Sequence, residues 1–295
     1  MNTPISILIP TYNYNVYPLV KEIHTQASLL NVPFEIVVVD DGSEKQLTNQ
    51  SLLQNLSHTK LITFKENKGR SAARGFLAKT ASYDYLLFLD ADVMPADIFY
   101  LKKYLENLKN NVVIAAGGVL YQRSKPEKDK ILRYKYGIGR EEKTPVQRNK
   151  ENNIIVSANL LIKKEIFQKI NTVTHNFYGD DLLLSSNIMK LGIKVLHIDN
   201  PVIHLGLESN QVFLKKSLTA VESLVALEKS KDLPGNLTKI QKTYKILKKN
   251  GLHVFTYWIL GIFKKPMKIN LLSNHPSLFL FDLYRLHHYI SIKNE

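Results

Sequence analysis

The first 120 residues of the chain alternate short apolar runs with stretches of helical periodicity. Between the apolar runs, hydrophobic residues recur every three or four positions, which is typical of helices with one buried face. Strands and helices in alternation indicate a parallel sheet covered on both faces, and they therefore predict a doubly wound α/β fold. The predicted strands are 5–9, 34–39, 61–64, 85–89 and 112–116, and the predicted helices are 19–30, 69–81 and 98–108.

The alternation stops after Gly118. The next stretch, 122–150, contains Gly137, Gly139 and Pro145, and we expect a long loop there. The later pattern predicts further strands at 154–156, 159–162 and 193–197, a helix at 180–191, and helices from about 210 to the end.

The composition sets limits on the class of protein. The chain is 44% hydrophobic and 22% charged, as in an ordinary globular protein. It contains no run of about 20 apolar residues and no secretory leader pattern at its start, so we expect a cytoplasmic protein. Because it has no cysteine, any metal must bind to oxygen or imidazole ligands.

The formal net charge of +14 is concentrated in two segments. Residues 122–150 carry ten basic and four acidic side chains, and residues 239–295 carry ten and two, whereas the rest of the chain carries 20 of each sign. Such an excess suits nucleic acid, an acidic membrane or an anionic substrate. We expect one domain at 1–235 and a basic, helical extension at 236–295.

Acidic residues follow two of the predicted strands. Asp40 and Asp41 end the second strand, and Asp90 and Asp92 end the fourth. Ligands of open α/β sheets bind at the carboxyl ends of strands, and two carboxylates on one side suit Mg²⁺ or Mn²⁺. The alternative is that aspartates simply end strands, because their side chains bond to the local backbone.

Two further segments contain candidate binding groups at helix starts. Asp180 and Asp181 open a predicted helix, where one carboxylate is expected as a cap and a second is not. The segment Asn67–Gly75 begins a helix with small residues and two arginines, which suits an anion. Small residues at a helix start also serve close packing, so this segment alone decides nothing.

Taken in order over roughly residues 4–205, these motifs resemble the family 2 glycosyltransferases. The later motif departs from the family pattern, because Asp180 replaces a glutamate and Asn187 occupies the usual arginine position. The matching residues are Pro10-Thr11-Tyr12-Asn13, Val39-Asp40-Asp41-Gly42-Ser43, Asn67-Lys68-Gly69 with Ala73-Arg74, Asp90-Ala91-Asp92, and Gly179-Asp180-Asp181 with Leu191-Gly192.

The resemblance implies a GT-A fold, a nucleotide-sugar donor, Mn²⁺ or Mg²⁺, and inversion at the anomeric carbon. It implies that Asp92 binds the metal and that Asp181 is the catalytic base with Asp180 supporting it. His204 is a further candidate metal ligand, with a structural histidine as the alternative. The residues that the resemblance assigns to the nucleotide sugar are Pro10, Thr11, Tyr12, Asp40, Asp41, Gly69, Arg74, Asp90 and Ala91.

Elementary chemistry agrees with this division of roles. Negative charge accumulates on the diphosphate as the sugar leaves, and a divalent cation stabilises it. The acceptor hydroxyl is a weak nucleophile, so a carboxylate must accept its proton. The residues therefore predict two separate acidic sites, one for the leaving group and one for the acceptor.

The basic extension leaves two interpretations open. Lysines line one side of 239–249, and the apolar segment 252–263 ends at Lys264 and Lys265. These features fit a helix at an anionic membrane surface through residues 239–293, on the inner face of the cell membrane, or a helix packed on the catalytic domain.

The sequence therefore predicts a metal-dependent inverting glycosyltransferase, with a UDP-sugar favoured by resemblance. The acceptor is expected to be a saccharide or lipid-linked hydroxyl in cell-surface polysaccharide or glycolipid synthesis. One rival is a sugar-nucleotide nucleotidyltransferase, which should have a glycine-rich basic loop where Pro10–Asn13 stands. A nucleic-acid-binding protein lacks a recognition motif here, and a binding module without catalysis does not account for the retained carboxylates.

Overall fold

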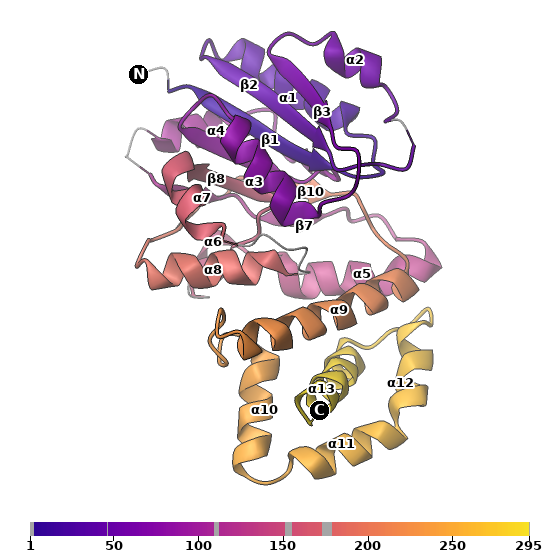
Figure 1. The fold of residues 1–295 in the computed structure, drawn as a ribbon. Coiled ribbons are helices and arrows are strands. Elements are labelled where there is room, and N and C mark those ends of the chain that lie inside the picture. The colour runs from indigo at the N-terminus through magenta and orange to yellow at the C-terminus, as the bar shows by residue number, and fades with distance from the viewer. Residues whose placement is uncertain (1–2, 46, 109–111, 151–154, 173–178, 295) are drawn as a thin grey trace. The chain divides into compact units, whose positions relative to one another are not determined.

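A computed structural model describes residues 3–45, 47–108, 112–150, 155–172 and 179–294. The chain forms two compact units (Figure 1). The first contains residues up to 122, then 142–172 and 180–206, and the second contains 123–141 and 207–294.

A mixed seven-stranded sheet forms the centre of the first unit. Strands β3, β2, β1 and β4 are parallel neighbours in that order, and β8 runs antiparallel between β4 and β6. This confirms the predicted doubly wound, mostly parallel sheet. The strands are β1 (Ile5–Thr11), β2 (Phe34–Asp40), β3 (Thr59–Thr63), β4 (Tyr85–Leu89), β6 (Ile114–Ala116), β8 (Asn159–Lys163) and β9 (Leu196–His197).

Helices pack on this sheet through the apolar positions that the sequence pattern marks. Leu77 and Phe167 lie in one buried cluster with Leu8, Val37 and Phe88 from the sheet. Val and Ile are frequent in β1 and β2 because their branched side chains fill both faces of a covered sheet. The helices of this unit are α1 (Tyr17–Leu29), α2 (Gln50–Gln54), α3 (Arg70–Thr80), α4 (Tyr100–Leu108), α6 (Pro145–Asn149), α7 (Lys164–Ile170) and α8 (Asp180–Lys190).

A second, three-stranded sheet was not predicted. It contains β5 (Val93–Pro95), β10 (Val202–His204) and β7 (Val119–Tyr121) in that order. Each strand has only three residues, which is too short for an alternating pattern to stand out. The pairing places His204 opposite Val93, one position beyond Asp92.

The predicted loop at 122–150 is wrong in part, because short helices occupy much of it. These are η1 (Lys128–Lys130), α5 (Ile131–Tyr136), η2 (Gly137–Glu141) and α6. Thr144 caps α6 through a capping box with Gln147, a local signal that the glycine and proline count obscured. The predicted strand at 154–156 is not formed at Ile155 and Val156, and Ile154 lies outside the described residues.

The second unit is helical, as predicted from about residue 210. Its helix α13 lies among α9, α10, α11 and α12 and contacts all four (Figure 1). Helix α9 packs against α13 and is therefore grouped with this unit, and the expected domain boundary at 235 stays a prediction. Besides the short helices η1, α5 and η2, its helices are α9 (Asn210–Lys229), α10 (Lys239–Lys249), α11 (His253–Ile262), α12 (Lys264–Leu271) and α13 (Leu278–Asn294).

None of the helices in the described residues is long and apolar enough to cross a bilayer.

Candidate active site

Hydrogen bonds tie together the loops that follow β1 and β2. The Asn13 backbone N–H donates to Ser43 Oγ at 2.8 Å, and the Glu44 N–H donates to Asn13 Oδ1 at 3.0 Å. The Asp40 carboxylate accepts from both the backbone and the hydroxyl of Ser43. These bonds hold the two loops in one arrangement at the carboxyl edge of the sheet, where the sequence predicted a ligand site.

Asp41 joins this edge to the start of α3. Its two carboxylate oxygens accept the backbone N–H groups of Lys68 at 2.8 Å and Gly69 at 2.9 Å. Burial, with a smaller effect of the Asp40 charge, raises the pKa of Asp41 against the opposing effect of these two hydrogen bonds. Gly69 has a φ of +90°, which glycine adopts without strain. Asp41 therefore shapes the predicted binding loop, and its contact with a base stays a prediction.

A buried arginine connects the carboxylates of two separate motifs. Arg74, on α3, is 1% exposed. Its guanidinium donates to Asp90 Oδ1 at 2.5 Å and to Asp180 Oδ2 at 3.0 Å, and Ser71 Oγ also donates to Asp180 at 3.0 Å. Burial alone would raise the pKa of both carboxyls, but the arginine charges outweigh it, so the pKa of each lies below its usual range. Both carboxylates are therefore held ionised.

Arg70 extends this network to the candidate base. Its guanidinium lies 2.8 Å from Asp180, 3.5 Å from Asp90 and 3.9 Å from the Asp181 carboxylate. The Arg70 side chain is 46% exposed, so it is the accessible cation of the cluster. We call Arg70, Arg74, Asp90, Asp180 and Asp181 the arginine–aspartate cluster.

Asp181 differs from its neighbour Asp180 in environment. Its Oδ1 accepts the Ser157 backbone N–H at 3.2 Å and the Ser157 hydroxyl, and its side chain is 24% exposed. Burial and the adjacent Asp180 charge raise the pKa of Asp181, against the opposing effect of the arginines. A partly exposed carboxylate with a raised pKa is a better proton acceptor than a carboxylate held by two arginines.

Asp90 and Asp92 turn to different partners, because Ala91 and Asp92 lie in a turn and not in an extended strand. Asp92 Oδ2 lies 3.3 Å from His204 Nε2. A side chain at Gly206 would place its Cβ 2.1 Å from that same Asp92 oxygen, so Asp92 can keep this position only beside a glycine. The three-stranded sheet thus brings the two candidate metal ligands together.

The Asp92–His204 pair fits a divalent cation. Neighbouring ligands of a six-coordinate ion with bonds of about 2.1 Å lie roughly 3 Å apart, close to the observed separation. Within the described part of the chain no cluster of three or more metal-ligating side chains is present.

The remaining predicted residues lie on the same edge. Pro10 and Thr11 are buried at the end of β1, and the Tyr12 side chain is 43% exposed beside them. Asn187, in the position where the resemblance expects an arginine, instead donates to the Ile170 carbonyl at 2.9 Å. It joins α8 to the end of α7 and does not take part in the arginine–aspartate cluster.

Sequence reasoning missed three residues of this edge. Ser71 binds Asp180, Gly206 makes room for Asp92, and Tyr14 lies close enough for the Asp92 charge, after burial, to raise its pKa. Ser71 stands one turn before Arg74 on the same helix, and this spacing could have indicated it. Gly206 and Tyr14 are revealed only by the pairing of β5 with β10 and by the β1 loop.

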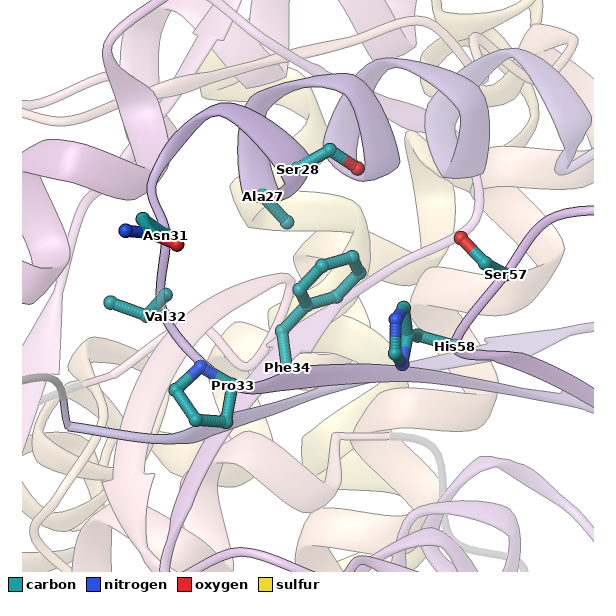
Figure 2. Close-up of a pocket in the computed structure, with 8 residues that line it drawn as sticks. All are labelled: Ala27, Ser28, Asn31, Val32, Pro33, Phe34, Ser57 and His58. Carbon is teal, nitrogen blue, oxygen red and sulfur yellow. The ribbon is translucent and has the colours of Figure 1, made fainter.

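A separate pocket lies at the opposite edge of the sheet (Figure 2). Its lining comes from the end of α1 and from Phe34 and His58, which stand at the amino ends of β2 and β3. The candidate site follows the carboxyl ends of these parallel strands, so this pocket is not part of it.

Comparison with known families places the chain in one of them. The family model described as Glycosyl transferase family 2 matches residues 6–171, which is more than half of the 295 residues. The chain therefore belongs to glycosyl transferase family 2, as the resemblance implied.

Curated relatives match only part of their own length. The chondroitin synthase of Pasteurella multocida (strain Pm70) is 29% identical over 120 residues, which cover 39% of this chain and 12% of that protein. The dolichol-phosphate mannosyltransferase of Pyrococcus furiosus is 37% identical over 131 residues, which cover 42% and 35%. The chain thus spans 12% and 35% of the length of these two relatives.

Solved structures resemble the chain over nearly its whole length. The mannosyltransferase PcManGT from Pyrobaculum calidifontis, in complex with GDP-Man and Mn²⁺, has a TM-score of 0.59 at 16% identity and covers 98% of this chain and 86% of its own. TarS of S. aureus has a TM-score of 0.52 at 17% identity, with 99% and 90% covered. Likeness at this identity shows the fold alone, and the fold is that of the GT-A glycosyltransferases.

Proposed function

We propose that this protein transfers a sugar from a nucleotide-diphosphate donor to an acceptor hydroxyl, with inversion at the anomeric carbon. The observation that supports this most directly is the arginine–aspartate cluster. It joins the carboxylate that follows β4, on the donor side, to the two carboxylates that open α8, on the acceptor side. A family 2 chain that only bound a ligand would not require this connection.

On the donor side, Asp92 and His204 would hold Mn²⁺ or Mg²⁺. The ion, when bound, supplies positive charge to the departing diphosphate. Tyr12 offers an exposed ring on which a base can stack, while Asp40 and Asp41 hold the loops around it. Asp90, held ionised by Arg74 and Arg70, offers its remaining lone pairs to the ribose.

On the acceptor side, Asp181 is the proposed base. It accepts the acceptor hydroxyl proton while the oxygen attacks the anomeric carbon from the face opposite the diphosphate. Ser157 fixes Oδ1, which leaves Oδ2 to take the proton. Asp180 stays ionised between two arginines, so its negative charge keeps the pKa of Asp181 raised.

The substrates are proposed only by class. Two of the matching structures are complexes with UDP-GlcNAc or with UDP and Mn²⁺, and a third contains GDP-Man and Mn²⁺. We favour a UDP-sugar donor and a saccharide or lipid-linked hydroxyl as acceptor, in cell-surface polysaccharide or glycolipid synthesis at the inner face of the membrane. A sugar-nucleotide nucleotidyltransferase loses support because the chain matches the glycosyl transferase family.

A thermal-shift screen tests the donor side first. UDP- and GDP-sugars are added with Mn²⁺, with Mg²⁺ or with EDTA, because a ligand that binds only the folded state raises its stability. We expect a rise in the unfolding temperature that depends on the metal. In His204→Ala the Mn²⁺ concentration required for this rise should increase by about 10- to 100-fold. A shift of equal size in EDTA would contradict the metal assignment, and no shift with any nucleotide sugar would contradict the donor class.

A further inference from the structure

Helix α11 presents an apolar face to solvent in the second unit. Phe255, Trp258, Ile259 and Ile262 recur at helical spacing along this face, which we call the α11 outer face. The Phe255, Trp258 and Ile262 side chains are 63%, 68% and 74% exposed. A contiguous apolar patch of this kind on a folded protein marks a surface that another body covers.

The opposite face of α11 makes the packing contacts. Leu260 is buried, and the Tyr257 ring stacks on His287 of α13 with centroids 4.8 Å apart. His253 meets the Tyr244 ring edge-on at 6.1 Å. The internal packing of this unit therefore uses one side of the helix and leaves the α11 outer face uncovered.

Lysines stand at both ends of this face, while the segment 250–263 between them contains no charged residue. The six lysines are exposed, and within the described chain none of them forms an ion pair. They are Lys245, Lys248 and Lys249 before α11, and Lys264, Lys265 and Lys268 after its end.

We propose that the α11 outer face docks on an anionic lipid bilayer. A helix with Trp, Phe and Ile on one side lies in the interface with that side among the acyl chains, and lysines at its ends reach the anionic headgroups. Tryptophan prefers this boundary because its ring is apolar and its N–H is polar. The lysine positions complement a surface that is negative over a wide area.

A second copy of the chain fits this surface less well. In a symmetric pair the same patch meets itself, so lysines flanking one α11 would face lysines flanking the other. Residues 239–295 carry ten basic and two acidic side chains, so they offer few carboxylates to neutralise such a contact. Charge therefore favours the bilayer over self-association.

The test uses the full chain and vesicles of phosphatidylcholine alone or of an equal mixture with phosphatidylglycerol. Trp258 is the single tryptophan of the chain, so its emission reports on this face alone. We expect co-sedimentation with the anionic vesicles, a blue shift of the emission, and quenching by brominated lipid. Binding should be about tenfold or more tighter than to phosphatidylcholine and should weaken with salt.

Two variants separate the two contributions. Phe255→Ser with Trp258→Ser and Ile262→Ser removes exposed side chains only, so the chain should fold and lose about tenfold or more in vesicle affinity. Replacing the six lysines by Gln should remove the preference for anionic vesicles while Trp258 still reports. If the lysine variant kept the same blue shift and the same salt sensitivity as the unchanged chain, the proposed contribution of the lysines to vesicle binding would be overturned.

A matched control removes three exposed apolar side chains from elsewhere, as Leu29→Ser, Ile98→Ser and Phe279→Ser. It should bind vesicles like the unchanged chain, and equal loss in this control would overturn the assignment to α11. Unchanged Trp258 emission with vesicles would do the same. The assignment would also be overturned if sedimentation equilibrium showed a dimer that dissociates only when the α11 outer face is substituted. The measurements involve no sugar transfer, so they succeed or fail independently of the proposed activity.

Discussion

The arginine–aspartate cluster of the first unit and the six lysines around α11 in the second arrange their charges in opposite ways. In the first unit, Arg70 and Arg74 lie against three carboxylates, so the charges of the arginine–aspartate cluster compensate one another inside the protein. In the second unit, the six lysines around α11 are exposed and have no carboxylate partner within the described residues. The lysines around α11 thus place part of the net charge of +14 at the surface, while the charges of the arginine–aspartate cluster are paired with one another.

This difference separates the roles of charge in the molecule. A paired, buried charge is costly to disturb, because removal of one partner leaves the other uncompensated. An exposed, unpaired charge contributes little to folding and remains available to an external partner. Substitutions in the two regions should therefore have opposite signatures in activity, stability and binding.

Asp181→Asn should give the largest effect, on turnover and not on folding. Loss of the proposed base should reduce the rate of sugar transfer by about 10² to 10⁴-fold. Because the pKa of Asp181 is raised, its charged form destabilises the folded chain at pH values above that pKa. This loss of stability disappears as the pH falls through the raised pKa. At neutral pH the free energy of unfolding should therefore stay within about 1 kcal/mol or rise, as urea denaturation would measure.

Asp180→Asn is the opposite control on the neighbouring residue. The lowered pKa of Asp180 contributes stability above the unfolded pKa, and this stability is lost as pH falls through the folded pKa. The variant should therefore lose stability at neutral pH. If Asp181→Asn were the less stable of the two, the assignment of the pairing to Asp180 would be wrong.

Arg74→Met should cost about 3 to 5 kcal/mol of unfolding free energy at neutral pH. Its side chain is 1% exposed and holds both Asp90 and Asp180 ionised. The loss should shrink as pH falls, because protonated carboxyls need no counter-charge. Arg70→Met, whose side chain is 46% exposed, should cost less. Equal losses for both variants at all pH values would contradict the buried pairing.

The sequence predicted the individual candidate residues of this site better than the contacts between them. Aspartates at a strand end or a helix start are local features, so the positions of Asp40, Asp90 and Asp181 could be predicted from the chain alone. The contacts of Arg70 with three carboxylates depend on how α3 meets α8, which no local pattern encodes. The pairing of Asp92 with His204 depends on three-residue strands that periodicity does not detect. The helices within 122–150 were missed because each has six residues or fewer and the glycines and proline of the segment suggested a loop.

Ser157→Ala should change the pH dependence of transfer more than its maximum rate. The Ser157 hydroxyl bonds to Asp181 and lowers its pKa against burial and the Asp180 charge. Without it the pKa rises further, so the acid side of the rate profile should move to higher pH. Ser43→Ala is a matched control, because its hydroxyl bonds to Asp40 and not to Asp181. A shift to lower pH, or an equal shift in both variants, would contradict Asp181 as the titrating base.

Replacing the six lysines around α11 by Gln should have the smallest effect on folding. These side chains are exposed and make no ion pairs within the described chain, so their charges mainly repel one another in the folded state. Lys248 also lies over the Tyr244 ring, with its Nζ 5.9 Å from the ring centroid. The free energy of unfolding should change by less than about 1 kcal/mol and should move upward at low salt. A loss as large as that of Arg74→Met would show that the lysines stabilise the second unit internally. An unchanged stability would leave them available to an external anionic surface, in contrast to the arginines of the first unit.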